Sequence, residues 1–168
     1  MTALFVSPKY IKRKSIIDGD VDADKIVQFI ETAQDIHIQN YLGTNLYKKL
    51  QSLIIAGTIN DVGNADYKLL LDDYIKPMLA WFTQAEYIPF AAYTISNGGV
   101  YKHRSDNSDA LDPSEIALLT TRANDKASFY TNRFLGYMNF HSELYPEYIS
   151  SSESMYPDRD VNNIGWVL

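Results

Sequence analysis

Apolar residues recur every three or four positions along four stretches of the chain, and this spacing predicts helices. The first stretch covers 22–43, where the repeating apolar groups are Ile26, Phe29, Ile30, Ala33 and Ile36. Gly43 follows at a point where helices commonly end in a left-handed residue, and Thr44 can cap a second, shorter helix over 44–56. We therefore expect two helices that meet at a tight corner.

The third stretch, 65–96, is the most apolar, and we predict that it forms one long helix or two consecutive ones at the centre of the fold. Pro77 and Pro89 lie inside it. Because each proline removes a backbone donor, we expect a bend or a break near both. The same stretch contains Glu86, which a membrane span would have to bury in lipid, so we expect no membrane segment.

The fourth stretch, 112–140, has the clearest helix start in the sequence. Asp112 can cap the helix, Pro113 suits its first position, and Glu115 can complete a capping box. The apolar stripe that follows consists of Ile116, Leu119, Ala123, Ala127, Tyr130, Phe134 and Tyr137. Together the four stretches predict an all-α fold, a small bundle of about four helices with an extended loop and extended N- and C-terminal arms.

Polar segments connect and flank these helices. The loop 97–111 begins with Asn97-Gly98-Gly99 and is polar enough to form a loop or a small hairpin that reaches outward. We predict that it is a contact surface, with the contacts made by Gly98, Gly99, Lys102, His103 and Arg104. The alternative is a surface loop without a partner.

The segment 143–168 loses the helical spacing and is rich in serine, proline and tyrosine. It holds Tyr145, Tyr148, Tyr156 and Trp166, so we interpret it as an extended arm that docks on another chain. The alternative is that these rings fold back over the helices of their own domain. On this interpretation 1–142 is the helical domain, including an N-terminal arm 1–20, and 143–168 is a separate arm.

The N-terminal arm combines a short apolar segment with basic residues. Leu4, Phe5 and Val6 form an edge strand or an arm laid on a neighbour. Lys9, Lys12, Arg13 and Lys14 are the densest positive charge in the chain, either a solvated face or a phosphate contact. The stretch lacks the pattern of an export signal.

Composition argues against several kinds of chemistry. The chain has no cysteine, which excludes disulfides and thiolate zinc sites, and its three histidines do not stand at a ligand spacing. It has no nucleophile elbow and no glycine-rich phosphate or dinucleotide loop. We therefore predict no catalytic residue, no cofactor and no metal site, and a protein that is not an enzyme. A net charge of −6 argues against a protein that grips nucleic acid.

One segment resembles a known family. The sequence AQDIHIQNYLGTNLYKKL at 33–50 is similar to the opening helix pair of the head-tail connector (adaptor) proteins of tailed bacteriophages, in particular the version carried by Bacteroidetes phages, crAss-like phages among them. The likeness extends through DDYIKPMLAWFTQAEYIPFAAY, the NGGVYKH turn and the YPEY element. These are packing and turn patterns, and none is a catalytic signature.

The resemblance implies a structural virion protein. Such a protein forms a ring, a dodecamer, in the neck below the portal, and it contacts the portal protein and other neck or tail proteins. DNA passes through the lumen of the ring without sequence-specific binding, which suits an acidic protein. The implied location is the neck of the virion, after assembly in the host cytoplasm. Two other classes stay open: a regulatory helical module that binds another protein, and a small enzyme of unrecognised type.

Overall fold

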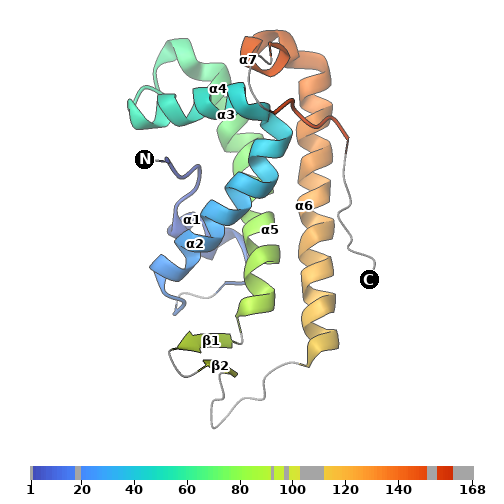
Figure 1. The fold of residues 1–168 in the computed structure, drawn as a ribbon. Helices are drawn as coiled ribbons and strands as arrows, with labels where there is room; N and C mark the ends of the chain where they lie inside the picture. The colour runs from blue at the N-terminus through green and yellow to red at the C-terminus, as the bar shows by residue number, and fades with distance from the viewer. Residues whose placement is uncertain are drawn as a thin grey trace.

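Helices form the body of the molecule, and a short hairpin extends from one end of it (Figure 1). The computed structural model describes residues 2–17, 20–91, 93–96, 99–102, 112–150 and 155–160. The elements are α1 (Pro8–Lys14), α2 (Ala23–Ala33), α3 (Gln39–Ile55), α4 (Ala65–Leu69), α5 (Lys76–Tyr87), β1 (Tyr93–Ser96), β2 (Gly99–Lys102), α6 (Pro113–His141) and α7 (Pro146–Ile149). The predicted all-α bundle is confirmed.

The central helix is α5, which packs against α2 on one side and α6 on the other (Figure 1). In Figure 1, α2 and α6 run in the same general direction and α5 runs against them. The core between these helices contains Ile26, Ile30, Leu42, Leu46, Leu70, Ile75, Met78 and Phe134, all fully buried. None of the helices in the described ranges has the length and apolar character that a bilayer crossing needs.

The predicted corner lies at Gly43. The segment Gln34–Ile38 is a π-helical turn that joins α2 to α3, and Gly43 then breaks the helix with φ +71° and ψ 164°. Glycine adopts this conformation without the penalty that a Cβ would bring. The chain therefore changes direction within α3, as the sequence predicts.

Both prolines of the central stretch mark departures from regular α-helix. A second π-helical turn, Leu70–Ile75, ends directly before α5, which has Pro77 in its first turn. Pro89 lies in a short 3-10 turn, Ile88–Phe90, that follows α5. The predicted bends are confirmed, because a proline has no N–H for the helical ladder.

The prediction that this helix continues to residue 96 was wrong. Tyr93–Ser96 instead forms β1, which pairs antiparallel with β2 and places Ser96 opposite Gly99. The segment Tyr-Thr-Ile-Ser has the aromatic and β-branched residues that favour a strand. The strand preference of these residues here outweighs the helical spacing of the apolar positions.

The N-terminal arm packs on its own domain, and the prediction that it is extended or laid on a neighbour was wrong for these residues. Phe5, Val6 and Ile11 are buried, and the Phe5 ring contacts Tyr47 with 5.3 Å between centroids. The buried side chain of Gln34 accepts a hydrogen bond from the Phe5 N–H (2.8 Å) and donates one to the Ala3 carbonyl (3.0 Å). These contacts fix the arm because a buried amide requires partners.

Candidate interaction surfaces

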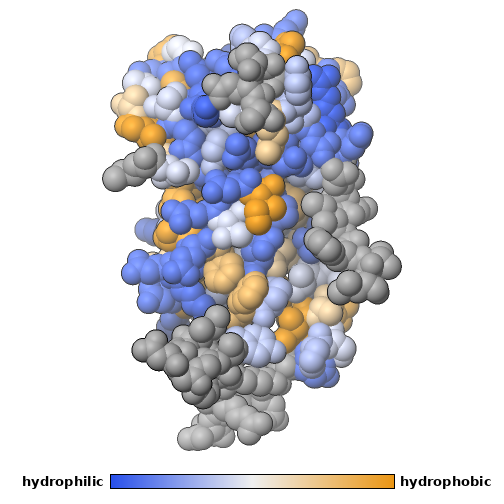
Figure 2. All heavy atoms as spheres, viewed as in Figure 1, coloured by the Kyte–Doolittle hydropathy of each residue, from blue (hydrophilic) through white to orange (hydrophobic). Residues whose placement is uncertain are grey.

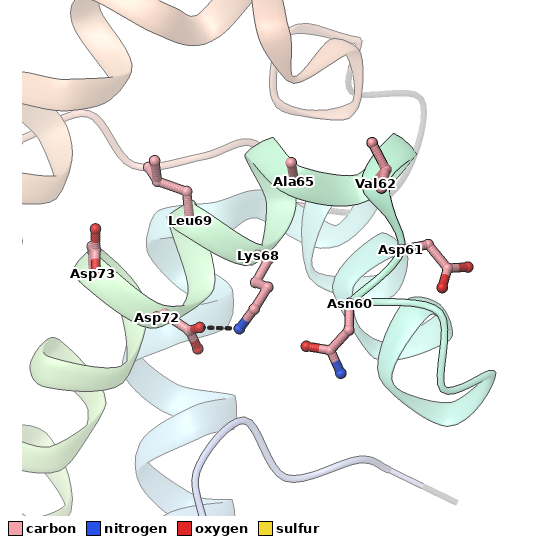
Figure 3. Close-up of a pocket in the computed structure, with 8 residues that line it drawn as sticks. All are labelled: Asn60, Asp61, Val62, Ala65, Lys68, Leu69, Asp72 and Asp73. Carbon is pink, nitrogen blue, oxygen red and sulfur yellow. Dashed lines mark hydrogen bonds and ion pairs between the residues drawn. The ribbon is translucent and has the colours of Figure 1, made fainter.

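A shallow hollow lies beside α4 on the described surface (Figure 3). It has a volume of about 330 Å³ and is wide open to solvent. Asp72 forms ion pairs with Lys68 and Lys76. Burial alone would raise the pKa of Asp72, but the hydrogen bonds and charges of the two lysines outweigh this effect and lower it. Asp61 and Asp73 point away from each other in Figure 3. The carboxylates therefore do not converge on a ligand, and within the described ranges no group of acidic and histidine side chains is arranged to hold a metal ion.

His37 is engaged inside the fold. Its ring stacks on Phe82 with 4.1 Å between centroids, and its Nε2 lies 2.8 Å from Glu86 Oε1. This arrangement fastens the corner of α2 and α3 to α5.

The predicted contact loop is described only in part. Gly99 and Lys102 lie in β2, where Gly99 pairs with Ser96 and Lys102 with Tyr93. Gly98, His103 and Arg104 lie outside the described residues. The contact role of the loop 97–111 therefore stays a prediction.

The prediction that Tyr145 and Tyr148 dock on another chain was wrong. Both rings are buried in their own domain, and Tyr145 is fully enclosed. The Tyr145 hydroxyl donates to the Asp66 carbonyl (3.0 Å) and lies 3.0 Å from the Tyr137 hydroxyl. Burial and this neighbouring hydroxyl raise the pKa of Tyr145. The helical domain therefore extends past 142, because these aromatics complete its core.

The tail 155–160 is also held by its own domain, at the Gly43 corner. The Thr44 N–H donates to the Met155 carbonyl (3.1 Å), and the Asp158 N–H donates to the Asn40 carbonyl (2.9 Å). Thr44 was expected to cap a helix, but its buried hydroxyl has no partner among the described residues. The tail satisfies backbone groups that the glycine break leaves free. Tyr156 is 73% exposed, and Trp166 lies outside the described residues.

The outer face of α6 carries the most extended apolar row. Leu118, Phe129 and Phe140 are 58%, 64% and 82% exposed. They stand 11 residues apart, which is about three turns, so they fall on one line about 33 Å long. The line faces away from the buried side of α6, which contains Ala127, Phe134 and Met138. Helical spacing predicts the buried stripe only; the outer row is visible in the sequence as large apolar residues that lie off that stripe.

Gly136 lies on the same line, between Phe129 and Phe140. A Cβ at this position would meet nothing within 4 Å, so no close contact inside the described chain requires a glycine here. Glycine in a helix interior costs about 1 kcal/mol relative to alanine. A glycine beside two exposed rings lets another backbone approach the helix closely.

Comparison with known proteins adds one finding. A family model described as a family of unknown function (DUF6712) matches residues 38–158, from the π-helical turn before α3 to the tail at the Gly43 corner. No curated protein and no solved structure matches the chain. The matched region contains the corner, α5, the outer row of α6 and the tail.

Proposed function

We propose that this chain, which belongs to the DUF6712 family of unknown function, is a structural subunit that assembles with copies of itself into a ring. We propose that the ring lies in the neck of a tailed phage, below the portal, where it conducts DNA and provides the platform for tail attachment. Its role is not enzymatic. The virion setting is supported by the resemblance of 33–50 and 72–93 to head-tail connector proteins.

The observation that carries the assembly part of the proposal is the row on the outer face of α6. Monomeric proteins expose single apolar side chains freely, but a long row on one element is typical of an interaction site. Leu118, Phe129 and Phe140 are large, well separated from the core and aligned over about 33 Å. A subunit that stays alone would leave this row in water.

Charge supports the role of a DNA duct. The chain has 21 acidic and 15 basic residues, which gives a net charge of −6. A passage rich in lysine would hold the phosphates that it must release, whereas an acidic subunit does not retain them. The proposal therefore includes passage of DNA without sequence-specific binding.

The test is the mass of the assembled particle. The purified full chain is examined by native mass spectrometry and negative-stain electron microscopy over a range of concentrations, alone and with a portal ring. We expect a closed ring of many copies under at least one of these conditions. The double variant Phe129→Ser/Phe140→Ser should weaken ring formation at least about tenfold in concentration.

The matched control is Ile55→Ser, which removes another exposed apolar residue, 63% exposed and away from α6, and should leave the ring intact. A chain that remains monomeric with and without portal would overturn the proposal. A one-to-one complex with a single other protein would favour a regulatory module instead.

A further inference from the structure

α2 carries an acidic row on the side of the molecule opposite α6. Asp24 and Glu31 of α2 and Asp35 of the π-helical turn that follows are exposed, recur at helical spacing and lie away from the buried residues Ile26 and Ile30. Asp35 also accepts a hydrogen bond from the Tyr47 hydroxyl (2.8 Å). In the view of Figure 2 the surface over α2 combines hydrophilic residues with some apolar ones. Asp24 and Glu31 form no ion pair with another residue in the described part of the chain.

α6 carries a basic row beside its apolar one. Arg122, Lys126 and Arg133 are exposed along the same edge of the helix. Two of them are braced by rings of neighbouring elements: Lys126 Nζ lies 4.1 Å from the centre of the Trp81 ring, and the Arg133 guanidinium lies 5.2 Å from the centre of the Tyr74 ring. Such cation–π contacts reduce the freedom of a long side chain while leaving its charge available.

The end residues of the two rows are separated by the same number of positions. Arg122 and Arg133 stand 11 residues apart on α6, and Asp24 of α2 stands 11 residues before Asp35 of the π-helical turn that continues it. The arginine pair therefore spans about 16 Å along α6, and the aspartate pair spans a similar length along α2 and the turn. We infer that the outer face of α6 in one copy packs against α2 of the next copy, with Arg122 opposite Asp24 and Arg133 opposite Asp35.

The direction of the helices fits this register. α2 and α6 run the same way in one copy, with α5 between them (Figure 1). A neighbour related by a small rotation keeps that direction, so its α2 lies parallel to α6. In this parallel arrangement Phe129 faces the exposed polar residues Gln28 and Thr32 of the neighbour's α2, and Asp125 comes opposite Lys25 on the other edge.

The contact joins two different surfaces on opposite flanks of the molecule. Such heterologous contacts add copies head to tail, and they close into a ring when the rotation permits. The inference rests on the proposed function and assigns its subunit interface: a second copy of this chain is the occupant of the α6 face. Because part of the attraction is between exposed charges, assembly weakens as salt is raised.

Cysteine cross-linking tests the register, since the chain has no cysteine of its own. Asp24→Cys protein is mixed with Arg122→Cys protein under mild oxidation, and a disulfide between the two chains is expected. The matched control is Asp24→Cys mixed with Arg133→Cys, whose sites lie about 16 Å apart in the parallel register and should cross-link at least about tenfold less.

Charge exchange gives a second, independent readout. Arg122→Glu/Arg133→Glu should raise the concentration needed for assembly at least about tenfold, and adding Asp24→Arg/Asp35→Arg to the same chain should restore it. If the wild type forms rings but the two cysteine mixtures cross-link equally, the proposed interface is wrong and the ring proposal stands. Absence of any wild-type oligomer, with or without portal, would instead overturn the proposed function and the interface with it.

Discussion

The ring of Pro157 lies directly against the backbone of Gly43. A Cβ on residue 43 would lie 2.8 Å from Pro157 Cδ, closer than side chains pack in proteins. Gly43 also has a φ of +71° and a ψ of 164°, a conformation that only glycine adopts readily. The glycine therefore has two roles: it turns the helix, and it leaves room for the tail.

Gly43→Ala should destabilise the protein by about 2 to 4 kcal/mol, because backbone strain and the contact with Pro157 add. The free energy of unfolding from urea titrations measures this loss. Gly57→Ala is the matched control, since Gly57 has a φ of +72° but a Cβ there would meet nothing within 4 Å. The control should cost only about 1 kcal/mol. Equal losses at both positions would show that the tail contact contributes nothing.

Truncation after Ser142 should strongly destabilise the domain, by at least about 3 kcal/mol, because it removes the buried rings of Tyr145 and Tyr148. Thermal unfolding followed by circular dichroism measures the effect. Truncation after Asp160 is the control and retains every tail residue that the structure describes. A chain cut after Ser142 that melts within a few degrees of the full-length protein would contradict the buried position of these tyrosines.

The longer helices were predictable from sequence because their signals are local, whereas the short helices α1 and α7 were not predicted. Each signal acts within a few residues: the spacing of apolar residues, the Asp112 capping box and the two prolines. The structure has a helix start at Asp112 and a departure from regular α-helix near each proline. Asp112 accepts hydrogen bonds from Ser114 N–H (2.8 Å) and Glu115 N–H (2.9 Å), and its own N–H donates to Glu115 Oε2 (2.9 Å). The cap forms as the sequence predicts.

The placement of the arms was not predictable in this way, because it depends on contacts between distant residues. Composition shows that 143–168 is rich in tyrosine, serine and proline, but it does not show which surface the tyrosine rings pack against. Tyr145 reaches Asp66, and Asp158 reaches Asn40, across 79 and 118 positions of sequence. The large apolar residues of the outer row of α6 are visible in the sequence, but the structure is needed to show that they are exposed.

Stability should fall between about pH 10 and 12. Burial raises the pKa of Tyr47 to about 12, against the opposing hydrogen bond from Gln34. Burial, followed by the hydrogen bond to Glu147, raises the pKa of Tyr67. In the unfolded chain these phenols ionise near pH 10, so the unfolded state binds fewer protons than the fold above that pH.

The measurement is the free energy of unfolding from urea titrations at pH 8 to 11. The stabilisation linked to these phenols is fully present below pH 10 and is lost as the pH rises through the folded values. Tyr67→Phe should reduce the slope above pH 10, since one raised group is removed. A free energy that stays constant to pH 11 would contradict the linkage.

Two phenylalanines of α6 allow a matched comparison of its buried and outer faces. Phe134 is fully buried, and Phe140 is 82% exposed. Phe134→Ala should cost about 3 to 5 kcal/mol, because it leaves a cavity in the core, whereas Phe140→Ala should change monomer stability by less than about 0.5 kcal/mol. Urea titrations at a concentration low enough to keep the chain monomeric measure both.

The same two variants separate folding from assembly. Phe140→Ala should fold normally and yet require a higher concentration to form oligomers, since its ring belongs to the outer row. Gly136→Ala is a second probe of that row: it should stabilise the monomer by about 1 kcal/mol, because alanine favours the helix and no neighbour within the described chain obstructs it. If the row is a contact between copies, this added methyl group should also weaken assembly, so that a more stable monomer is a poorer subunit. A Gly136→Ala protein that assembles as well as the wild type would show that no backbone approaches α6 closely at this point.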